Sequence, residues 1–307
     1  MDKELSSIHY DQYLQLQKIL DAQKLRSVEF NKPAHDEMLF IIVHQVYELW
    51  FKEILHDLGS IMELFSEGRV EEAQIGVAIS RLDRIVKIQK ILVDQIDIIE
   101  TMTPLDFLDF RNYLLPASGF QSFQFRQLEV SLGLKRERRI SYTQCSYSGV
   151  FSDHEQAILN KLESGDSMFD LVEKWLERTP FLEFETFDFL EEYKKSVQLM
   201  LKREEQAIDK ADYISDQEKM LRVRMLGETN TYFNSVFNKD VHEKKIMEGS
   251  LKLSYKATIS ALLINLYRDE PLLRQPFMFL QKLIDMDELL TTWRYGHAQM
   301  VLRTGGQ

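Results

Sequence analysis

Apolar residues recur at helical spacing along almost the whole chain, and this pattern strongly limits its fold. No segment shows the two-residue alternation of a strand. The 307 residues include only 12 Gly and 6 Pro, so few positions would interrupt a helix. The sequence therefore predicts an all-α fold, with helices over about 5–25, 37–65, 69–100, 104–114, 121–133, 153–163, 166–178, 185–210, 214–236, 250–268 and 277–303.

The domain organisation is expected to be simple, because no Gly/Ser/Pro-rich linker, repeat or low-complexity tract is present. We expect a single domain over 1–307, with the more charged stretch at about 150–215 as a helical insertion over a core built from the two ends. Three helix starts carry capping signals: Thr103 before Pro104, Ser152-Asp153 before His154, and Asp166 before the helix that contains Trp175.

The charge and the chain start narrow the partners and the compartment. A formal net charge of −11 argues against nucleic acid and against an anionic membrane surface, and favours a small ligand. The single cysteine, Cys145, excludes an internal disulfide. Met1-Asp2-Lys3-Glu4 does not resemble a signal peptide, and no apolar run approaches the roughly 18 residues that span a bilayer. We therefore expect a cytoplasmic protein.

One histidine interrupts an apolar helix face. In "HDEMLFIIVHQVYELWFKEIL", Phe40, His44, Tyr47 and Phe51 share one face at helical spacing. A second histidine, His297, has similar surroundings in "LLTTWRYGHAQMVLR". Two buried histidines on two long helices are either hydrogen-bonded core residues or the ligands of a haem, one axial and one distal. The residues alone leave both interpretations open.

The other histidines are weaker candidates. His9, His154 and His242 stand among polar neighbours and are expected at the surface, while His35 precedes a helix start. His56 completes a Glu-x-x-His motif that di-iron bundles need twice, and the chain has it once.

An arginine is also placed between apolar residues. In "TPLDFLDFRNYLLPASGFQSFQFRQLE", Phe107, Arg111 and Leu114 share a helix face. A half-buried guanidinium needs an anion, and its planar fork matches a carboxylate. That anion could be a ligand, or it could be a structural partner among Asp106, Asp109 and Glu129.

Three of these segments, with the N-terminal "YDQYLQLQKILDAQ", resemble the tryptophan 2,3-dioxygenase family. The resemblance runs in order from about residue 10 to about 303, and its middle motif is long and specific. It implies an all-α protein that binds haem b, usually a homotetramer. It also implies that the reaction opens the indole ring of L-tryptophan with O2 and gives N-formylkynurenine.

The resemblance also assigns roles to single residues. His297 matches the axial ligand of the haem iron, and His44 matches the distal histidine that faces the indole N–H. Arg111 matches the arginine that pairs with the substrate carboxylate. The other positions that match substrate-site residues are Phe40, Phe107, Leu114, Ser118 near the haem edge, and Tyr10, Tyr13 and Leu14, which reach the pocket of a neighbouring subunit in the family.

Three departures from the family pattern stand out. The family follows its last helix with a glycine- and threonine-rich lid, whereas this sequence stops at Gln307, so we expect weak tryptophan binding if the lid is absent. Ile96 stands where many members carry an aromatic residue near the proximal histidine, and Gly296 stands where arginine is usual. The surroundings that tune the iron are therefore expected to differ.

Two alternatives remain beside the dioxygenase. One is a related haem monooxygenase acting on another indole or aromatic substrate. The other is a haem-binding paralogue without turnover, which would need His297 but neither Arg111 nor Phe40.

Overall fold

The computed structural model describes residues 7–117, 119–134, 151–179, 183–184 and 187–303. Helices dominate these residues, and the predicted all-α fold is confirmed. In the described part of the chain the only strands are β1 (Glu183–Phe184) and β2 (Phe187–Asp188), which form a short antiparallel hairpin. None of the helices described is both long enough and apolar enough to cross a membrane.

The chain divides into two compact units. The first contains Met1–Gly59, Arg81–Leu162 and Lys282–Gln307, and the second contains Ser60–Ser80 and Glu163–Gln281. The second unit overlaps only in part with the insertion expected at about 150–215. Each unit is described separately below.

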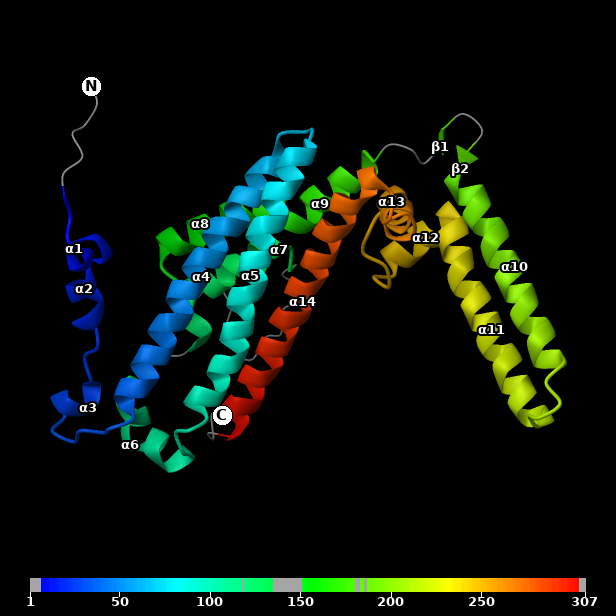
Figure 1. The fold of residues 1–307 in the computed structure, drawn as a ribbon. Coiled ribbons are helices and arrows are strands. Elements are labelled where there is room, and N and C mark those ends of the chain that lie inside the picture. The colour runs from blue at the N-terminus through cyan, green and yellow to red at the C-terminus, as the bar shows by residue number, and fades with distance from the viewer. Residues whose placement is uncertain (1–6, 118, 135–150, 180–182, 185–186, 304–307) are drawn as a thin grey trace, which may run out of the picture. The chain divides into compact units, whose positions relative to one another are not determined.

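Three long helices form the core of the first unit: α4 (Glu37–Ser66), α5 (Glu72–Ile99) and α14 (Pro271–Arg303), which run side by side in Figure 1. Within this unit the Tyr47 hydroxyl donates to the carbonyl oxygen of Leu92 at 3.1 Å, and the Gln89 side chain donates to that of Met286 at 3.2 Å. The apolar stripes of the helices are buried between them, including Val43, Phe51, Ile54, Leu58, Ile85, Leu92 and Trp293. The remaining turns of these helices belong to the second unit.

Shorter elements complete the first unit: α1 (Tyr10–Leu14), α2 (Leu16–Leu20), α3 (Arg26–Glu29), α6 (Pro104–Leu114), the 3₁₀ turn η1 (Gly119–Gln121), α7 (Phe123–Leu132) and α8 (Asp153–Ser164). The single helix expected over about 5–25 is interrupted. Gln15 adopts a left-handed backbone conformation with φ 51°, which ends α1 and precedes α2. A left-handed residue cannot continue a right-handed helix.

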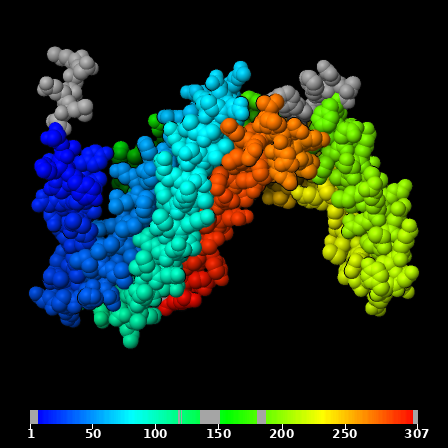
Figure 2. Space-filling model, in the orientation of Figure 1, coloured from blue at the N-terminus to red at the C-terminus, as the bar shows by residue number. Residues whose placement is uncertain are grey.

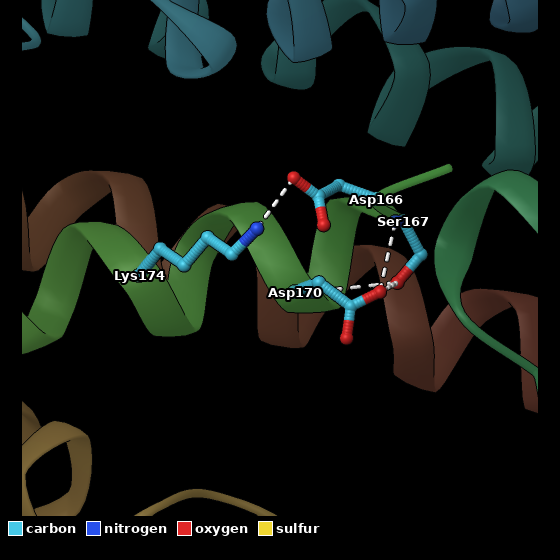
Figure 3. A network of polar contacts seen from close by, with 4 residues as sticks. All are labelled: Asp166, Ser167, Asp170 and Lys174. Carbon is cyan, nitrogen blue, oxygen red and sulfur yellow. Dashed lines mark hydrogen bonds and ion pairs between the residues drawn. The ribbon is translucent and has the colours of Figure 1, made fainter. Parts of the chain in front are cut away.

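Two helix starts can be compared with the capping signals. Thr103 caps α6 as predicted, because its side chain accepts from the Asp106 N–H while the Asp106 carboxylate accepts from the Thr103 N–H. For α9 (Met168–Glu177) the predicted cap was wrong by one residue. Figure 3 shows Ser167 and Asp170 forming the capping box, whereas Asp166 accepts from Lys174 at 2.6 Å.

The second unit contains α9, the hairpin, α10 (Phe189–Asp209), α11 (Asp216–Phe237), α12 (Lys239–Met247) and α13 (Tyr255–Leu266). Helices α10 and α11 are antiparallel neighbours in contact, drawn in green and yellow in Figure 2. Phe189, Val236, Ile259 and Leu263 form a buried cluster of this unit. Buried Phe65 and Phe279 stack at 4.8 Å between ring centroids, and half-buried Trp175 packs against both.

The sequence patterns gave no sign of α12, and the surface position expected for His242 on it is wrong. His242 is 1% exposed. Its Nδ1 lies 3.2 Å from the carbonyl oxygen of Ser235, and its Nε2 lies 2.9 Å from that of Leu253. Both ring nitrogens thus lie within hydrogen-bond distance of backbone carbonyl oxygens. These contacts allow the polar ring to be buried, although its sequence neighbours are charged.

Helix α14 begins at Pro271, six residues before the predicted start at 277. Pro276 lies inside it, near its N-terminal end. Pro276 is the sixth residue of the helix, beyond the first turn, so it removes one i→i−4 backbone hydrogen bond. Beyond Pro276 the helix runs unbroken to Arg303 and carries Trp293 and His297.

Candidate functional site

His44 lies on the inner face of α4, and its tautomer follows from one contact. Its Nδ1 atom is 2.7 Å from the backbone carbonyl oxygen of Phe40, one turn earlier. A carbonyl can only accept, so Nδ1 carries the proton and the neutral ring presents Nε2 as an acceptor. Burial lowers the pKa of His44, although the Phe40 carbonyl and the charge of Glu48 oppose that shift. The ring is therefore neutral near pH 7 and offers one lone pair.

His297 lies on α14 and stacks on the residue one turn earlier. Its ring centroid is 5.3 Å from that of Trp293, with the planes at 24°. Burial lowers the pKa of His297, and a positive charge on His44 would lower it further, so the two imidazoles interact electrostatically. Among the residues that the structure describes, none makes a hydrogen bond to the His297 ring. A neutral, half-buried imidazole with an unbonded nitrogen has the chemistry of a metal ligand.

An aromatic wall connects the helices around these histidines. Trp293 contacts the rings of Tyr47, Phe51 and Phe125 at centroid distances of 5.7, 5.8 and 5.0 Å. Burial raises the pKa of Tyr47 to about 12, against the opposing effect of the Trp293 indole N–H. That N–H makes no hydrogen bond of normal geometry, although it is buried. The wall is thus almost wholly apolar and keeps both imidazoles out of bulk water.

The predicted substrate residues of α6 lie beside Phe40 of α4. The Phe40 ring is 4.1 Å from His44 and 5.7 Å from Phe107. The Arg111 guanidinium lies over the Phe107 ring, 5.8 Å from its centroid. The structure therefore brings His44, Phe40, Phe107 and Arg111 into one chain of contacts, with half-buried Leu114 at the end of the same helix.

Two of the three structural partners considered for Arg111 have other contacts. Asp106 caps α6, and Glu129 pairs with Arg126 and Arg294. Asp109, the third residue considered, lies on the same helix as Arg111.

Three predicted residues, all on α1, are not brought to this place within the chain. Tyr10 and Tyr13 are 74% and 72% exposed, and Leu14 is also exposed. No described contact joins these α1 side chains to His44 or Arg111. Ser118 lies outside the described residues.

Some neighbours of the site were not singled out from the sequence. Phe110 is fully buried and its ring lies 5.5 Å from Phe40 and 5.4 Å from Phe107. Gln124 of α7 donates to both the backbone and the carboxylate of Glu48, one turn after His44. The three-residue spacing from Phe107 could have indicated Phe110, but no local pattern could have paired Gln124 with Glu48.

The donor set fits a haem better than a cluster-bound metal ion. No three side chains of His, Cys, Asp or Glu converge on one point among the described residues. Glu53, which belongs to the Glu-x-x-His motif, lies 3.6 Å from Arg84. A haem needs one axial nitrogen and a wide apolar environment, which His297 and the aromatic wall provide.

The fold and site thus define a class, an all-α protein that offers one unbonded imidazole as an axial ligand and a second neutral histidine on another helix. Sequence comparison gives the particular family. The family model for tryptophan 2,3-dioxygenase matches residues 1–307. The chain belongs to this family.

Individual relatives agree. The tryptophan 2,3-dioxygenase of Alteromonas mediterranea is 47% identical over 306 residues, which cover 100% of this chain and 84% of the relative. That of Bdellovibrio bacteriovorus is 47% identical over 300 residues, covering 98% and 84%. That of the insect Mayetiola destructor is 47% identical over 301 residues, covering 97% and 76%.

Proposed function

We propose that this protein uses haem b and O2 to open the indole ring of L-tryptophan, giving N-formylkynurenine. Membership of the tryptophan 2,3-dioxygenase family supports this reaction. The structural observation that carries it is the pair of neutral histidines, His44 and His297, with His44 linked through Phe40 and Phe107 to Arg111. Both atoms of O2 enter the product, one at each carbon of the cleaved C2–C3 bond, so no external reductant is consumed.

The haem would be held by His297, because that ring is neutral and its nitrogens are unbonded in the described structure. When bound, the haem supplies the binding and activation of O2. Trp293 stacks on His297 and would keep the ring from rotating.

The substrate would be oriented by His44 from one side. Nδ1 is committed to the Phe40 carbonyl, so Nε2 is free to accept the indole N–H. This contact fixes the position of C2 and C3 without removing a proton. Phe40, Phe107 and Leu114 would cover the flat indole and exclude water, and Ser118 is proposed near the haem edge.

Arg111 would bind the substrate carboxylate through its planar fork. A charge-assisted hydrogen bond of this kind contributes about 1.5–3 kcal/mol. Such a contact favours an amino acid over a bare indole. Tyr10, Tyr13 and Leu14 are proposed to complete the pocket of a neighbouring subunit, and their exposure supports that role. We take the protein to be a cytoplasmic homotetramer.

The test is a single-turnover and steady-state assay on the haem-loaded ferrous protein. Addition of L-tryptophan under air should consume one O2 per substrate and produce the absorption band of N-formylkynurenine. With ¹⁸O₂ the product should carry two labelled oxygen atoms. One labelled atom would favour a monooxygenase instead, and no tryptophan-dependent O2 uptake would favour a paralogue without turnover.

A further inference from the structure

Helix α7 contacts the histidine-bearing helices α4 and α14 within the first unit. Toward α4, the Gln124 amide lies 2.8 Å from both the backbone oxygen and the carboxylate of Glu48, which is one turn after His44. Toward α14, the Phe125 ring lies 5.0 Å from Trp293, one turn before His297. Adjacent residues of one short helix therefore touch the surroundings of both histidines.

The second contact between α7 and α14 is a buried charge. Glu129 is 3% exposed, yet it carries a carboxylate that pairs with Arg126 on its own helix and with Arg294 of α14 at 3.6 Å. Phe125 and Glu129 are four residues apart and share one face of α7, while Trp293 and Arg294 are adjacent on α14. The ring contact and the ion pair thus hold the same turn of α14 at two points.

This turn determines where His297 points. Arg294 and His297 are three residues apart, so their side chains are neighbours on the surface of α14. A rotation or shift of α14 that displaced His297 would also pull Arg294 away from a buried carboxylate. Such movement is unfavourable because the buried Glu129 carboxylate would lose one of its two cationic partners and keep only Arg126.

We propose that Glu129 and Arg294 are positioning residues for His297. Their ion pair fixes the rotation of α14 and presents the imidazole to the haem iron in one orientation. This inference rests on the proposed role of His297 as the axial ligand. It assigns a function to the buried carboxylate of the "FRQLE" segment other than pairing with Arg111.

The same helix supplies a matched control. Arg303, the last residue of α14, pairs with Glu100, which follows the end of α5, at 3.0 Å. That arginine side chain is 72% exposed, against 36% for Arg294. Exposed pairs hold a helix only weakly. Arg303→Met therefore makes the same chemical change on α14 without breaking a contact to a buried charge.

The experiment compares Arg294→Met and Arg303→Met in the haem-loaded protein. Three quantities are measured: the rate of haem transfer to excess apomyoglobin, the iron–histidine stretching band of the ferrous protein by resonance Raman spectroscopy, and the unfolding midpoint of the haem-free protein. Arg294→Met should lose haem roughly ten- to a hundredfold faster and shift or broaden the band. Arg303→Met should stay within about twofold of the parent protein, as expected for a weak exposed pair. Arg294→Lys, which keeps the charge, should recover part of the difference.

Two outcomes would overturn the inference. One is an Arg294→Met protein whose haem-loss rate and Raman band match those of Arg303→Met. The other is a lower unfolding midpoint with an unchanged band, since that result describes a merely structural pair. Glu129→Gln, which keeps the shape of the side chain, repeats the test from α7. If the parent protein lacks an iron–histidine band or His297→Ala retains it, the proposed ligand itself is wrong, and the two failures are thereby distinguished.

Discussion

A β-carbon on Gly296 would lie 2.9 Å from the Cδ1 atom of Ile96. Ile96 is buried on α5, and the glycine immediately before His297 leaves the space that its side chain occupies. The two departures from the family pattern are therefore one feature, because each residue fits the other. Helix α5 supports the turn of α14 that carries the proposed iron ligand through this contact.

Gly296→Ala should destabilise the protein despite the better helix propensity of alanine. Propensity alone would contribute about 0.5–1 kcal/mol, while overpacking costs about 1–3 kcal/mol. Adding Ile96→Val removes Cδ1 and should recover stability relative to Gly296→Ala alone. Gly59→Ala on α4 is the control, since a β-carbon there meets nothing within 4 Å and the change should stabilise. Denaturant unfolding of the parent, Gly296→Ala, Ile96→Val and the double variant measures the coupling, and purely additive effects would contradict it.

The two histidines should differ in what they lose on substitution. His297→Ala should remove most haem from the purified protein, because the axial bond is lost. His44→Ala should keep haem and lose oxygenation, because only the acceptor for the indole N–H is removed. Haem content by the pyridine haemochromogen method and product formation measure the two effects. Full haem content with an unchanged axial spectrum in His297→Ala would refute the ligand assignment.

The decrease of kcat/KM at acid pH should reflect protonation of His44. Its ordinary pKa is about 6.5 and burial lowers it, so the neutral acceptor form persists at pH 6.5. Below the lowered pKa the ring gains a proton at Nε2, and kcat/KM should fall about tenfold per pH unit. His44→Gln should be less active and should lack this limb between pH 5 and 7. The same acid limb in both proteins would assign it to another group.

The lowered pKa also has a consequence for stability. Between the folded pKa of His44 and the unfolded value near 6.5, the unfolded chain binds more protons than the folded protein. Stability contributed by this residue is therefore present above about pH 6.5 and is lost as the pH falls through that window. Urea unfolding of the haem-free protein at pH 7.5 and 5.5 should show a smaller decline in His44→Phe. An equal decline would exclude His44 as its source.

Arg111 should discriminate between tryptophan and its decarboxylated analogue. Arg111→Ala should reduce kcat/KM for L-tryptophan by about ten- to a hundredfold, which corresponds to the loss of a contact worth about 1.5–3 kcal/mol. Tryptamine has no carboxylate, so its kcat/KM should change little. Arg126→Ala cannot serve as a control, because Arg126 pairs with Glu129. Arg224→Ala on α11 is a suitable control, because exposed Arg224 forms an ion pair with Glu228. An unchanged ratio between the two substrates would contradict the carboxylate role.

The first helix should matter more for substrate than for haem. Removing residues 1–25 deletes Tyr10 and Tyr13, which this chain leaves exposed. Tryptophan binding should weaken while haem content stays near normal. Light scattering at the working concentration should report a homo-oligomer for the intact protein. A monomer that binds tryptophan normally would argue against a pocket shared between subunits.

Long-period patterns predicted most of the fold, and short-range conformational details decided the rest. The helices α4, α5 and α14 could be predicted because their apolar residues recur at helical spacing over many turns. The interruption of the first helix at Gln15 could not be predicted, since it depends on the backbone conformation of one polar residue. Helix α12 was missed because its charged sequence has little apolar periodicity, although His242 on it is buried.

The candidate site divides in a similar way. His44, Phe40, Phe107 and Arg111 were suggested by helix faces and by family resemblance, and the structure places them in contact. Their arrangement toward one another depends on partners far away in sequence. Glu129 illustrates this, because its pairing with Arg294 links segments that no local pattern could relate.

The position of the two histidines in the chain has a consequence for biosynthesis. His44 belongs to α4, the first long helix of the described chain to leave the ribosome, whereas His297 lies in the last one, α14. Closing so long a loop is entropically unfavourable until the intervening helices have packed. If His297 binds the haem iron as proposed, the nascent chain lacks this ligand during most of its synthesis, and haem uptake would have to follow the completion of α14.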